Sequence, residues 1–456
     1  MIPAIRAKFN IVPTKKELNF TIYRNAALGL VIFFTVSCNS VSRSKDKNTV
    51  SDSIAILKLP EPHTVSAAEF TSIKNASEQW YDSVLKPGNF NGSILVAKNG
   101  QVIFERYSGT GHLPGTDNIT EHTPLHIASI TKTFTAMAVL KLMQDGKLSL
   151  DDEFSKYFPA FNYPGVTIRS LLNHRSGLPN YTHFLENLGW DKSRIVTNED
   201  VLDFLITRKA ELTDITNPNT HFTYCNTNYA LLALLIEKIS TKKYADYLNE
   251  AFFIPLQMKN SFVFNLTDSA KALPSYDWRG RLEPLNFLDM VYGDKNIYTT
   301  VRDLLIWDRA LSTNLLFTKE TLEQAFTPYS NEKAGIRNYG LGWRMNIYPN
   351  EKKVIYHNGW WHGSNATFIR LLNESATIIV IGNKFNRHVY HAKDLTAIFD
   401  NYYGPVDDDE TEPLKDLSII SDSNLKTATV HNNNLLKEKN VTVNKPLKKN
   451  KRNNKK

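Results

Sequence analysis

A serine and a lysine stand three positions apart in the segment LHIASITKTFTAMAVLKLM, residues 125–143. In a helix that begins there, Ser129 and Lys132 would project from one face, within reach of each other. The residues after Lys132 are apolar on nearly every side until the stop signal Asp145-Gly146, which is typical of a helix buried in a sizeable protein. Burial disfavours the charged form of a lysine, so its neutral amine could act as a base towards the neighbouring hydroxyl. The segment therefore predicts nucleophilic catalysis by Ser129, with Lys132 as its base.

The S-x-x-K spacing is not specific by itself. It occurs seven times in the chain, starting at Ser42, Ser44, Ser83, Ser129, Ser240, Ser330 and Ser423. Ser129 alone opens a long apolar helix, whose first N–H groups and positive dipole could stabilise an oxyanion. A capping serine beside a lysine whose amine reaches solvent is the structural alternative. The context of Ser129 favours catalysis.

Two downstream segments carry what a serine hydrolase of this kind also needs, a second proton carrier and a strand edge that holds the substrate. Tyr224-Cys225-Asn226 lies in a loop that leads into an apolar helix, and His357-Asn358-Gly359 ends a predicted strand. The Y-x-N pattern is not specific, since it also begins at Tyr23, Tyr247, Tyr329, Tyr348 and Tyr356. A core tyrosine and a sheet-edge histidine are the structural alternatives for the two segments. Their order and setting, taken together, favour a catalytic site.

The pattern of apolar residues predicts the elements that would position these side chains. Glu69 to Leu85 is expected to form an amphipathic helix, and two β-rich runs joined at Lys98-Asn99-Gly100 are expected to form a hairpin. Helical patterns predominate between residues 150 and 330, and a last helix is expected near Ala392 to Tyr403. Late strands are expected within residues 339–349, 352–359, 365–373 and 376–384. We therefore expect an α/β fold of mixed α+β type: one mixed sheet closed by both ends of the domain, a helical insertion, and an active site between the two lobes.

The composition is that of a globular protein with an electrically neutral body. The chain has 456 residues, 42% of them hydrophobic, which is enough for the packed core of one large or two ordinary domains. The last 26 residues hold nine Lys/Arg and one Glu; subtracting them from the chain's 54 basic and 46 acidic residues leaves 45 of each. The formal charge of +8 therefore belongs to a tail, and no nucleic-acid partner is expected.

Residues 1–37 are predicted to be a signal peptide. Lys15, Lys16 and Arg24 precede an apolar run of about eleven residues, which is too short to span a bilayer and ends in small residues. Cys38 directly after it resembles the lipidated cysteine of a bacterial lipoprotein, although Thr35 stands where that pattern prefers Leu. A plain signal peptide and an uncleaved anchor are the alternatives. We expect an exported lipoprotein of the bacterial cell envelope, attached to the membrane through Cys38, with its body on the periplasmic side.

The remaining organisation follows from composition along the chain. Residues 38–62, rich in Ser, Lys, Asp and Pro, are predicted to be a tether, and residues 63–405 the folded domain. Residues 406–456 are Asn/Lys-rich and are expected to be disordered, as a solvated tail or in contact with anionic polymers of the envelope. Cys225 has no internal disulfide partner once Cys38 is lipidated or removed. No metal or other cofactor is expected, because histidine pairs in the chain lack the further ligands of a zinc site.

Together these segments resemble the class C β-lactamase-related serine hydrolases, a family that includes penicillin-binding DD-peptidases, D-aminopeptidases and esterases. The resemblance covers roughly residues 65 to 403 and rests on several segments in one order. They read IASITKTFTAMAV, DDEFSKYFP, VTIRSLLNHRSGLPNY, FTYCNTNYALL, YGLGWR and HNGWWHG. The resemblance implies a β-lactamase/transpeptidase-like fold, with an antiparallel sheet flanked by helices and an all-helical subdomain.

The resemblance also implies catalytic roles. Ser129 would be the nucleophile and Lys132 the base next to it. Tyr224 would carry the proton to the leaving group and, in hydrolysing members, activate the deacylating water. Asn226 would hydrogen-bond the lysine or a substrate amide. His357 occupies the third motif, where lactamases usually have Lys-Thr-Gly.

The residues after His357 are implied to bind the substrate. Asn358 and Gly359 would line the strand edge, and the backbone N–H of Trp360 would form an oxyanion hole together with that of Ser129. A histidine near neutral pH is largely uncharged, so the site lacks the lysine that attracts the carboxylate of a β-lactam. This disfavours an efficient β-lactamase, while the two tryptophans suit an ester or a bulky acyl group.

We therefore expect a serine hydrolase that acts on a small-molecule or peptidoglycan-derived ester or amide through an acyl-enzyme on Ser129. Esterase and D-amino-acid peptidase activities both fit this expectation. The alternative is a non-catalytic cell-wall-binding lipoprotein that keeps a penicillin-binding fold.

Overall fold

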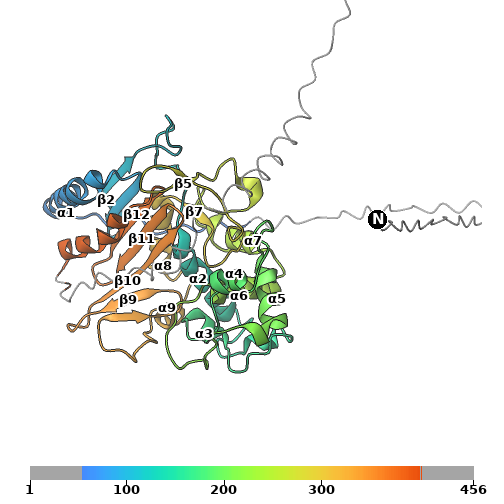
Figure 1. Cartoon of the computed structure of the whole chain (residues 1–456). Helices are drawn as coiled ribbons and strands as arrows, with labels where there is room; N and C mark the ends of the chain where they lie inside the picture. Colours follow the sequence, from blue (N-terminus) through green and yellow to red (C-terminus); the bar gives the residue numbers. More distant parts are fainter. Residues whose placement is uncertain (1–53, 401, 403–456) are drawn as a thin grey trace, which may run out of the picture. The chain divides into compact units, whose positions relative to one another are not determined.

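A seven-stranded antiparallel sheet forms the centre of the computed structural model, which describes residues 54–400 and 402 (Figure 1). The strand order is β2-β1-β12-β11-β10-β9-β8. The strands are β1 (Gly92–Lys98), β2 (Gln101–Ser108), β8 (Arg337–Tyr339), β9 (Arg344–Ile347), β10 (Lys353–Trp361), β11 (Ser364–Leu371) and β12 (Ala376–Gly382). All the pairings within this sheet are antiparallel, so the expectation of a mixed sheet was wrong, whereas the antiparallel sheet implied by the family resemblance is observed.

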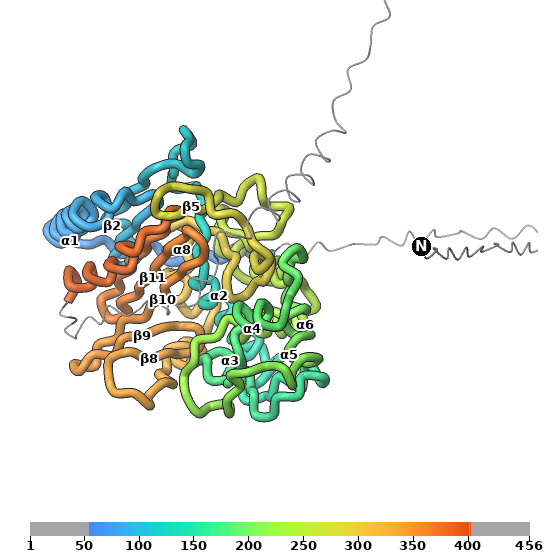
Figure 2. The backbone as a smooth tube through the Cα atoms, in the orientation of Figure 1, coloured from blue at the N-terminus to red at the C-terminus, as the bar shows by residue number. Residues whose placement is uncertain are grey.

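The first and last strands of the domain are neighbours in this sheet. β1 pairs with β12 along its whole length, from Gly92 opposite Gly382 to Lys98 opposite Ala376. In Figure 2 the blue N-terminal segment and the orange-red C-terminal segment accordingly lie side by side. The predicted hairpin between β1 and β2 is confirmed, because Asn99 and Gly100 form its two-residue turn with φ of 54° and 76°.

Both faces of the sheet are covered, and the residues of β1, β11 and β12 alternate between the two cores. On one face, Ile94 and Val96 pack with α1 (Ala67–Trp80), the turn η1 (Tyr81–Leu85) and the 3₁₀ segment η8 (Arg387–Ile398). On the other face, Leu95 and Ala97 belong to the core that contains α2 (Thr131–Gln144) and α8 (Val301–Leu311). The last helix expected near Ala392 is thus a 3₁₀ segment.

The central part of the chain forms a group of helices beside the sheet (Figure 1). Its centre is α6 (Asn226–Ser240), whose residues Thr227 to Ile236 are all buried. Around it lie α3 (Ile168–Leu172), α4 (Tyr181–Asn187), α5 (Asn198–Thr207) and α7 (Tyr244–Leu248), while α9 (Lys319–Ala325) packs against α2. Short strands connect this part to the site: β3 (Leu125–His126), β7 (Ile297–Thr299) and β4 (Phe262–Val263) form one small sheet, and β5 (Ser275–Tyr276) and β6 (Leu282–Glu283) form another.

Several expectations concern residues at the two ends of the chain. The predicted signal peptide, Cys38 and the Asn/Lys-rich tail lie outside the described residues. Residues 54–62 contain no helix or strand, and the Leu57 N–H donates to the carbonyl of Pro255 at 2.8 Å. None of the helices described in residues 54–400 has both the length and the apolar character that crossing a membrane requires.

Candidate active site

Ser129 and Lys132 are in direct contact, as their spacing predicted. Ser129 lies in a 3₁₀ turn, Ala128–Ile130, that leads into α2, and Lys132 is in the first turn of that helix. The Lys132 Nζ is 3.0 Å from the Ser129 Oγ and donates to the carbonyl of Asp294 at 2.9 Å. Lys132 is fully buried, in keeping with the apolar surroundings expected for this helix. The hydroxyl and the amine are thus held together at the N-terminal end of a buried helix.

The strand β10 passes close to the turn that carries Ser129, and a glycine makes this approach possible. A Cβ atom on Gly359 would lie 2.2 Å from the carbonyl oxygen of Ile127 and 3.3 Å from the Cβ of Ala128. The carbonyl of Gly359 accepts a hydrogen bond from Tyr390 Oη at 2.9 Å, which ties this part of β10 to η8. This part of β10, which includes Gly359 and Trp360, therefore lies beside the nucleophile turn, and the substrate-binding role of these residues stays a prediction.

Tyr224 lies next to the same lysine. The Lys132 Nζ is 4.9 Å from the centroid of the Tyr224 ring and 5.7 Å from that of Tyr229 on α6. Asn226 is the half-buried first residue of α6. In the described part of the chain its side chain makes no hydrogen bond, so the bond to Lys132 is not observed, and the bond to a substrate amide stays a prediction.

His357 is a neutral, buried residue in the middle of β10, not at the end of a strand as expected. Its Nδ1 is 2.6 Å from the carbonyl of Asn358, and its Nε2 is 3.2 Å from the hydroxyl of Tyr339. The Nδ1–H can therefore donate to the carbonyl while Nε2 accepts from the tyrosine. Burial, followed by the positive charges of Arg344 and Lys132, holds the pKa of His357 well below its ordinary value.

The residues that follow His357 contact β11, the end of the β10–β11 hairpin and the loop that contains Asp289. Asn358 faces β11, where its Oδ1 accepts from the Thr367 hydroxyl at 2.7 Å. The Trp360 indole N–H donates to the carbonyl of His362 at 2.9 Å. The Trp361 indole N–H donates to Asp289 Oδ1 at 2.5 Å. These side chains brace the hairpin between β10 and β11.

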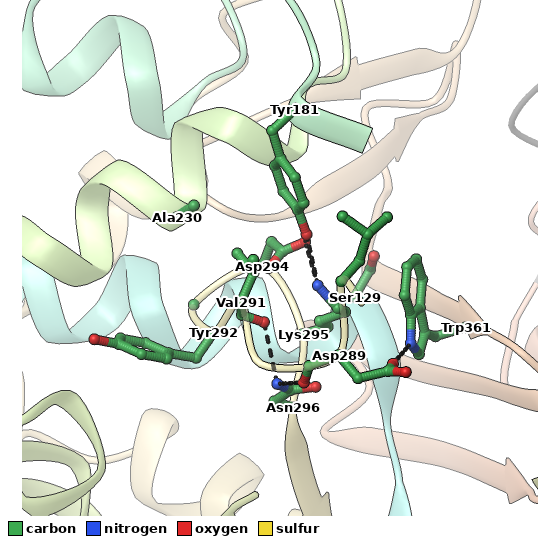
Figure 3. A network of polar contacts seen from close by, with 12 residues as sticks. Ser129, Tyr181, Ala230, Asp289, Val291, Tyr292, Asp294, Lys295, Asn296 and Trp361 are labelled. Carbon is green, nitrogen blue, oxygen red and sulfur yellow. Dashed lines mark hydrogen bonds and ion pairs between the residues drawn. The ribbon is translucent and has the colours of Figure 1, made fainter. Parts of the chain in front are cut away.

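The loop that contains Asp289 and Asp294 carries a buried polar network that the sequence did not reveal (Figure 3). Lys295 Nζ donates to the Tyr181 hydroxyl at 2.5 Å, and this hydroxyl donates to Asp294 Oδ2 at 2.9 Å. The ammonium of Lys295 is 3.6 Å from Asp294 Oδ2 and 4.6 Å from the Trp361 ring centroid. Burial lowers the pKa of Lys295, although both aspartates oppose this effect. The sequence signal for this network was the charged pair Asp294-Lys295, separated by Asn296 from the buried strand β7.

Asp289 anchors the β10–β11 hairpin to this loop. His362 Nε2 is 2.9 Å from Asp289 Oδ1, and the carboxylate is only 4% exposed. Burial raises the pKa of Asp289, but the charge and hydrogen bond of His362 and the hydrogen bond of Trp361 outweigh it, so the net shift is downward. The hairpin and the loop that supplies the Asp294 carbonyl are thereby joined.

Two further side chains complete the electrostatic surroundings. The guanidinium of Arg344, on β9, lies 4.9 Å from the centroid of the Tyr224 ring. The other arginine, Arg370 on β11, is bound to Asp308 of α8 at 2.5 Å and is 1% exposed. Arg344 is therefore the arginine of this pair that stands beside the site.

Cys225 is not placed as a nucleophile. Its thiol is directed at the carbonyls of Leu178 and Pro179, at 3.4 and 3.5 Å. Burial raises the pKa of the thiol to about 11, so the thiolate is scarce at neutral pH. The thiol is thus directed at these carbonyls and not at Lys132.

Comparison with known proteins places this arrangement in a family. A family model described as Beta-lactamase matches residues 84–402. Penicillin-binding protein 4* of Bacillus subtilis (strain 168) is 30% identical over 334 residues, which cover 70% of this chain and 73% of that protein.

Comparison with solved structures shows the same fold in two proteins. The octameric penicillin-binding protein homologue from Pyrococcus abyssi superposes with a TM-score of 0.61 at 25% identity, covering 72% of this chain and 78% of that one. The D-amino acid amidase from Ochrobactrum anthropi SV3 shares the fold with a TM-score of 0.59 at 21% identity, covering 73% of this chain and 97% of that one. The fold class implied by the motifs is confirmed, and so is the resemblance itself. The chain belongs to the beta-lactamase family of serine hydrolases.

Proposed function

We propose that the chain hydrolyses an ester or amide through an acyl-enzyme on Ser129. The observation that carries the proposal is the 3.0 Å contact between the Ser129 hydroxyl and the buried amine of Lys132. A nucleophilic hydroxyl needs a base within hydrogen-bond reach, and no rearrangement is required to supply one here.

Lys132 would take the proton of the Ser129 hydroxyl as the oxygen attacks the substrate carbonyl. Two effects act on its amine in opposite directions. Full burial removes the water that stabilises an ammonium ion, while the faces of the Tyr224 and Tyr229 rings attract it. The carbonyl of Asp294 accepts one N–H and thereby orients the amine, leaving its lone pair available for the serine when the amine is neutral.

The remaining steps would use groups that converge on this pair. Tyr224 would pass the proton to the leaving group and later activate the water that releases the acyl group. The backbone N–H groups of Ser129 and Trp360 would stabilise the oxyanion, an interaction whose loss typically costs about 10²-fold or more in rate. The approach of β10 to the nucleophile turn at Gly359 supports this assignment.

The substrate class follows from the charges around the carbonyl position. His357 is neutral and fully buried, so the third motif supplies no fixed charge. We propose a short ester or an amide as the acyl donor, with a D-amino-acid derivative as the amide, which the names of a penicillin-binding relative and an amidase of the same fold support.

A fluorophosphonate probe tests the proposal directly. The wild-type protein should be labelled, with the added mass on the peptide that contains Ser129, and Ser129→Ala should not be labelled. Absence of labelling, or equal labelling of both proteins, would favour a binding protein without turnover. Turnover of p-nitrophenyl acetate, a D-amino-acid amide, a D-Ala-D-Ala peptide and nitrocefin would then rank the acyl donors.

We also propose that the domain works in the bacterial cell envelope, on the periplasmic side, held to the membrane by a lipid on Cys38. The support is the basic and apolar N-terminal segment that ends at this cysteine. Cells grown with labelled palmitate should yield a labelled protein, and Cys38→Ala should abolish the label. An unlabelled wild-type protein would instead indicate a cleaved secretory signal or an uncleaved peptide anchor.

A further inference from the structure

We propose that His174 is a positioning residue for Tyr224, holding that side chain against Lys132. The inference rests on the proposed function, because it gives Tyr224 a role in proton transfer. Sequence reasoning did not single out His174, although the residue lies in the segment VTIRSLLNHRSGLPNY.

The backbone at His174 is unusual for a side chain of this size. The helix α3 ends at Leu172 and is capped by Asn173, and the next residue, His174, has φ of 57°, in the left-handed region. At this place after a helix, glycine is usual and asparagine is the common substitute, because a Cβ atom is disfavoured there. The backbone conformation alone would suit glycine best, so the contacts of the imidazole ring are what distinguish histidine from glycine at this position.

His174 holds the chain on both sides of Tyr224. Its carbonyl accepts the N–H of Thr223 at 2.9 Å, and its ring Nδ1 accepts the N–H of Cys225 at 3.1 Å. Two hydrogen bonds to one residue thus flank the tyrosine, and together they fix the direction in which its side chain leaves the backbone.

The imidazole ring also packs on Tyr224 itself. The two ring centroids are 4.4 Å apart with an interplanar angle of 36°. Tyr229 and Tyr339 lie at 5.1 and 4.9 Å from the same imidazole, and His174 is only 1% exposed. Backbone and ring contacts therefore act on Tyr224 together.

The hydrogen bond to Cys225 requires a neutral imidazole with its proton on Nε2. Burial, then the charges of Lys132 and Arg344, keep the pKa of His174 well below its ordinary value. The Nε2 atom is buried and has no hydrogen-bond partner within residues 54–400. A buried N–H without a partner is unfavourable, so this ring is not the choice that stability alone would make.

Three substitutions separate positioning from packing. His174→Asn places a carbonyl oxygen near the Nδ1 position and suits the left-handed backbone. His174→Gly relieves the backbone but removes acceptor and ring, and His174→Leu restores apolar volume without an acceptor. Thr241→Gly is the matched control, because Thr241 is an exposed residue with φ of 60° at the end of α6.

We expect His174→Gly and His174→Leu to lower kcat for a p-nitrophenyl ester on the order of 10-fold or more, since small displacements of a reacting group have large effects. KM should change much less, His174→Asn should recover most of the rate, and Thr241→Gly should leave it unchanged. Far-ultraviolet circular dichroism and melting curves identify any variant that has not folded. Whichever of His174→Gly and His174→Leu has folded is then compared with His174→Asn. Equal losses in the Asn variant and in that folded variant would overturn the proposal.

The Tyr224→Phe background provides the second measurement. If His174 acts through Tyr224, replacing it there should cost little further rate, because groups that act as one unit are not additive. An undiminished cost in that background would assign His174 a role that does not pass through Tyr224. The probe experiment distinguishes a failure of this proposal from a failure of the proposed function. If the protein is labelled on Ser129 and loses rate in Tyr224→Phe, the proposed function stands. A folded His174→Gly variant with the full rate would then disprove only the role of His174.

Discussion

The Lys132 amine contacts one acceptor close in the chain and one far away: the Ser129 hydroxyl three positions earlier, and the backbone carbonyl of Asp294, 162 positions later. The carbonyl of Asp294 cannot be removed by changing a side chain, so the orientation of the amine is built into the backbone. A base held in this way should be as indispensable as the nucleophile that it serves.

Lys132→Ala should therefore reduce turnover nearly as much as Ser129→Ala, because the two groups act as one unit. The measurement is kcat/KM for a p-nitrophenyl ester on both variants and the double variant, at one pH. The double variant should lose as much kcat/KM as either single variant does. A Lys132→Ala protein that keeps more than about a tenth of the wild-type rate would show that another group is the base.

Arg344 should set the preference for charged substrates. The guanidinium of Arg344 lies 4.9 Å from the centroid of the Tyr224 ring, so a carboxylate near the scissile bond would meet its positive charge there, whereas His357 is neutral and Arg370 is bound to Asp308. Arg344→Gln should lower the ratio of kcat/KM for an N-acyl-D-Ala-D-Ala peptide over a neutral ester by about tenfold, equivalent to roughly 1.4 kcal/mol.

Arg344→Lys is the control for this preference, since it keeps the charge but not the planar guanidinium. It should retain most of the wild-type ratio. If the glutamine variant loses rate on both substrates alike, Arg344 acts through its contact with the Tyr224 ring instead of through the substrate.

At the scale of elements, the site depends on how closely β10 approaches the turn before α2. Gly359→Ala would place a methyl group within 2.2 Å of the Ile127 carbonyl, so the strand or the turn must shift. We expect this variant to lose on the order of 10²-fold in turnover, as for a small misplacement of reacting groups, with a smaller effect on melting temperature. Activity above half of the wild-type level would mean that the distance between β10 and the turn is not critical.

Elements with short-range signals were the ones that sequence reasoning predicted. The hairpin at Asn99-Gly100 and the contact between Ser129 and Lys132 follow from neighbouring residues, because turn geometry and helical spacing are local properties. The placement of Tyr224 and His357 came from the family resemblance, since nothing in either segment specifies its distant partner.

The contacts that sequence reasoning missed are long-range and polar. The pairing of Asp289 with His362 joins a loop to a hairpin across 73 positions, and the Lys295 amine meets Tyr181 across 114. Buried charges in a sequence look like surface charges until the fold shows what surrounds them. The predicted domain limits and export signals stay predictions.

At the scale of the whole molecule, buried histidines should make stability depend on pH. His126, His174 and His357 are all buried, and burial lowers the pKa of each, to about 3 for His126. In the unfolded chain they would take up protons near pH 6.5. The stability that they contribute is therefore complete above that pH and is lost as the pH falls below it.

As the pH falls from 7 to 5, each histidine that stays neutral in the folded protein should lower the free energy of unfolding by about 2 kcal/mol. Burial raises the pKa of Asp303, so the contribution of Asp303 to the free energy of unfolding changes with pH in the opposite direction. Urea unfolding at pH 7, 6 and 5 measures the sum, and His126→Asn should show a weaker pH dependence than the wild type. A midpoint that stays constant over this range would mean that protons enter the folded core without disrupting it.

The pairing of β1 with β12 also dictates an order of events during synthesis. Asn91, just before β1, donates to the side chain of Asn383, 292 positions later, so the centre of the sheet is incomplete until almost the whole domain has been made. Contacts of such separation form late, because a long loop must close first. A nascent chain that lacks β12 would therefore carry its nucleophile helix without the completed sheet that covers it, and the domain would stay incompletely folded until its last strand has been synthesised.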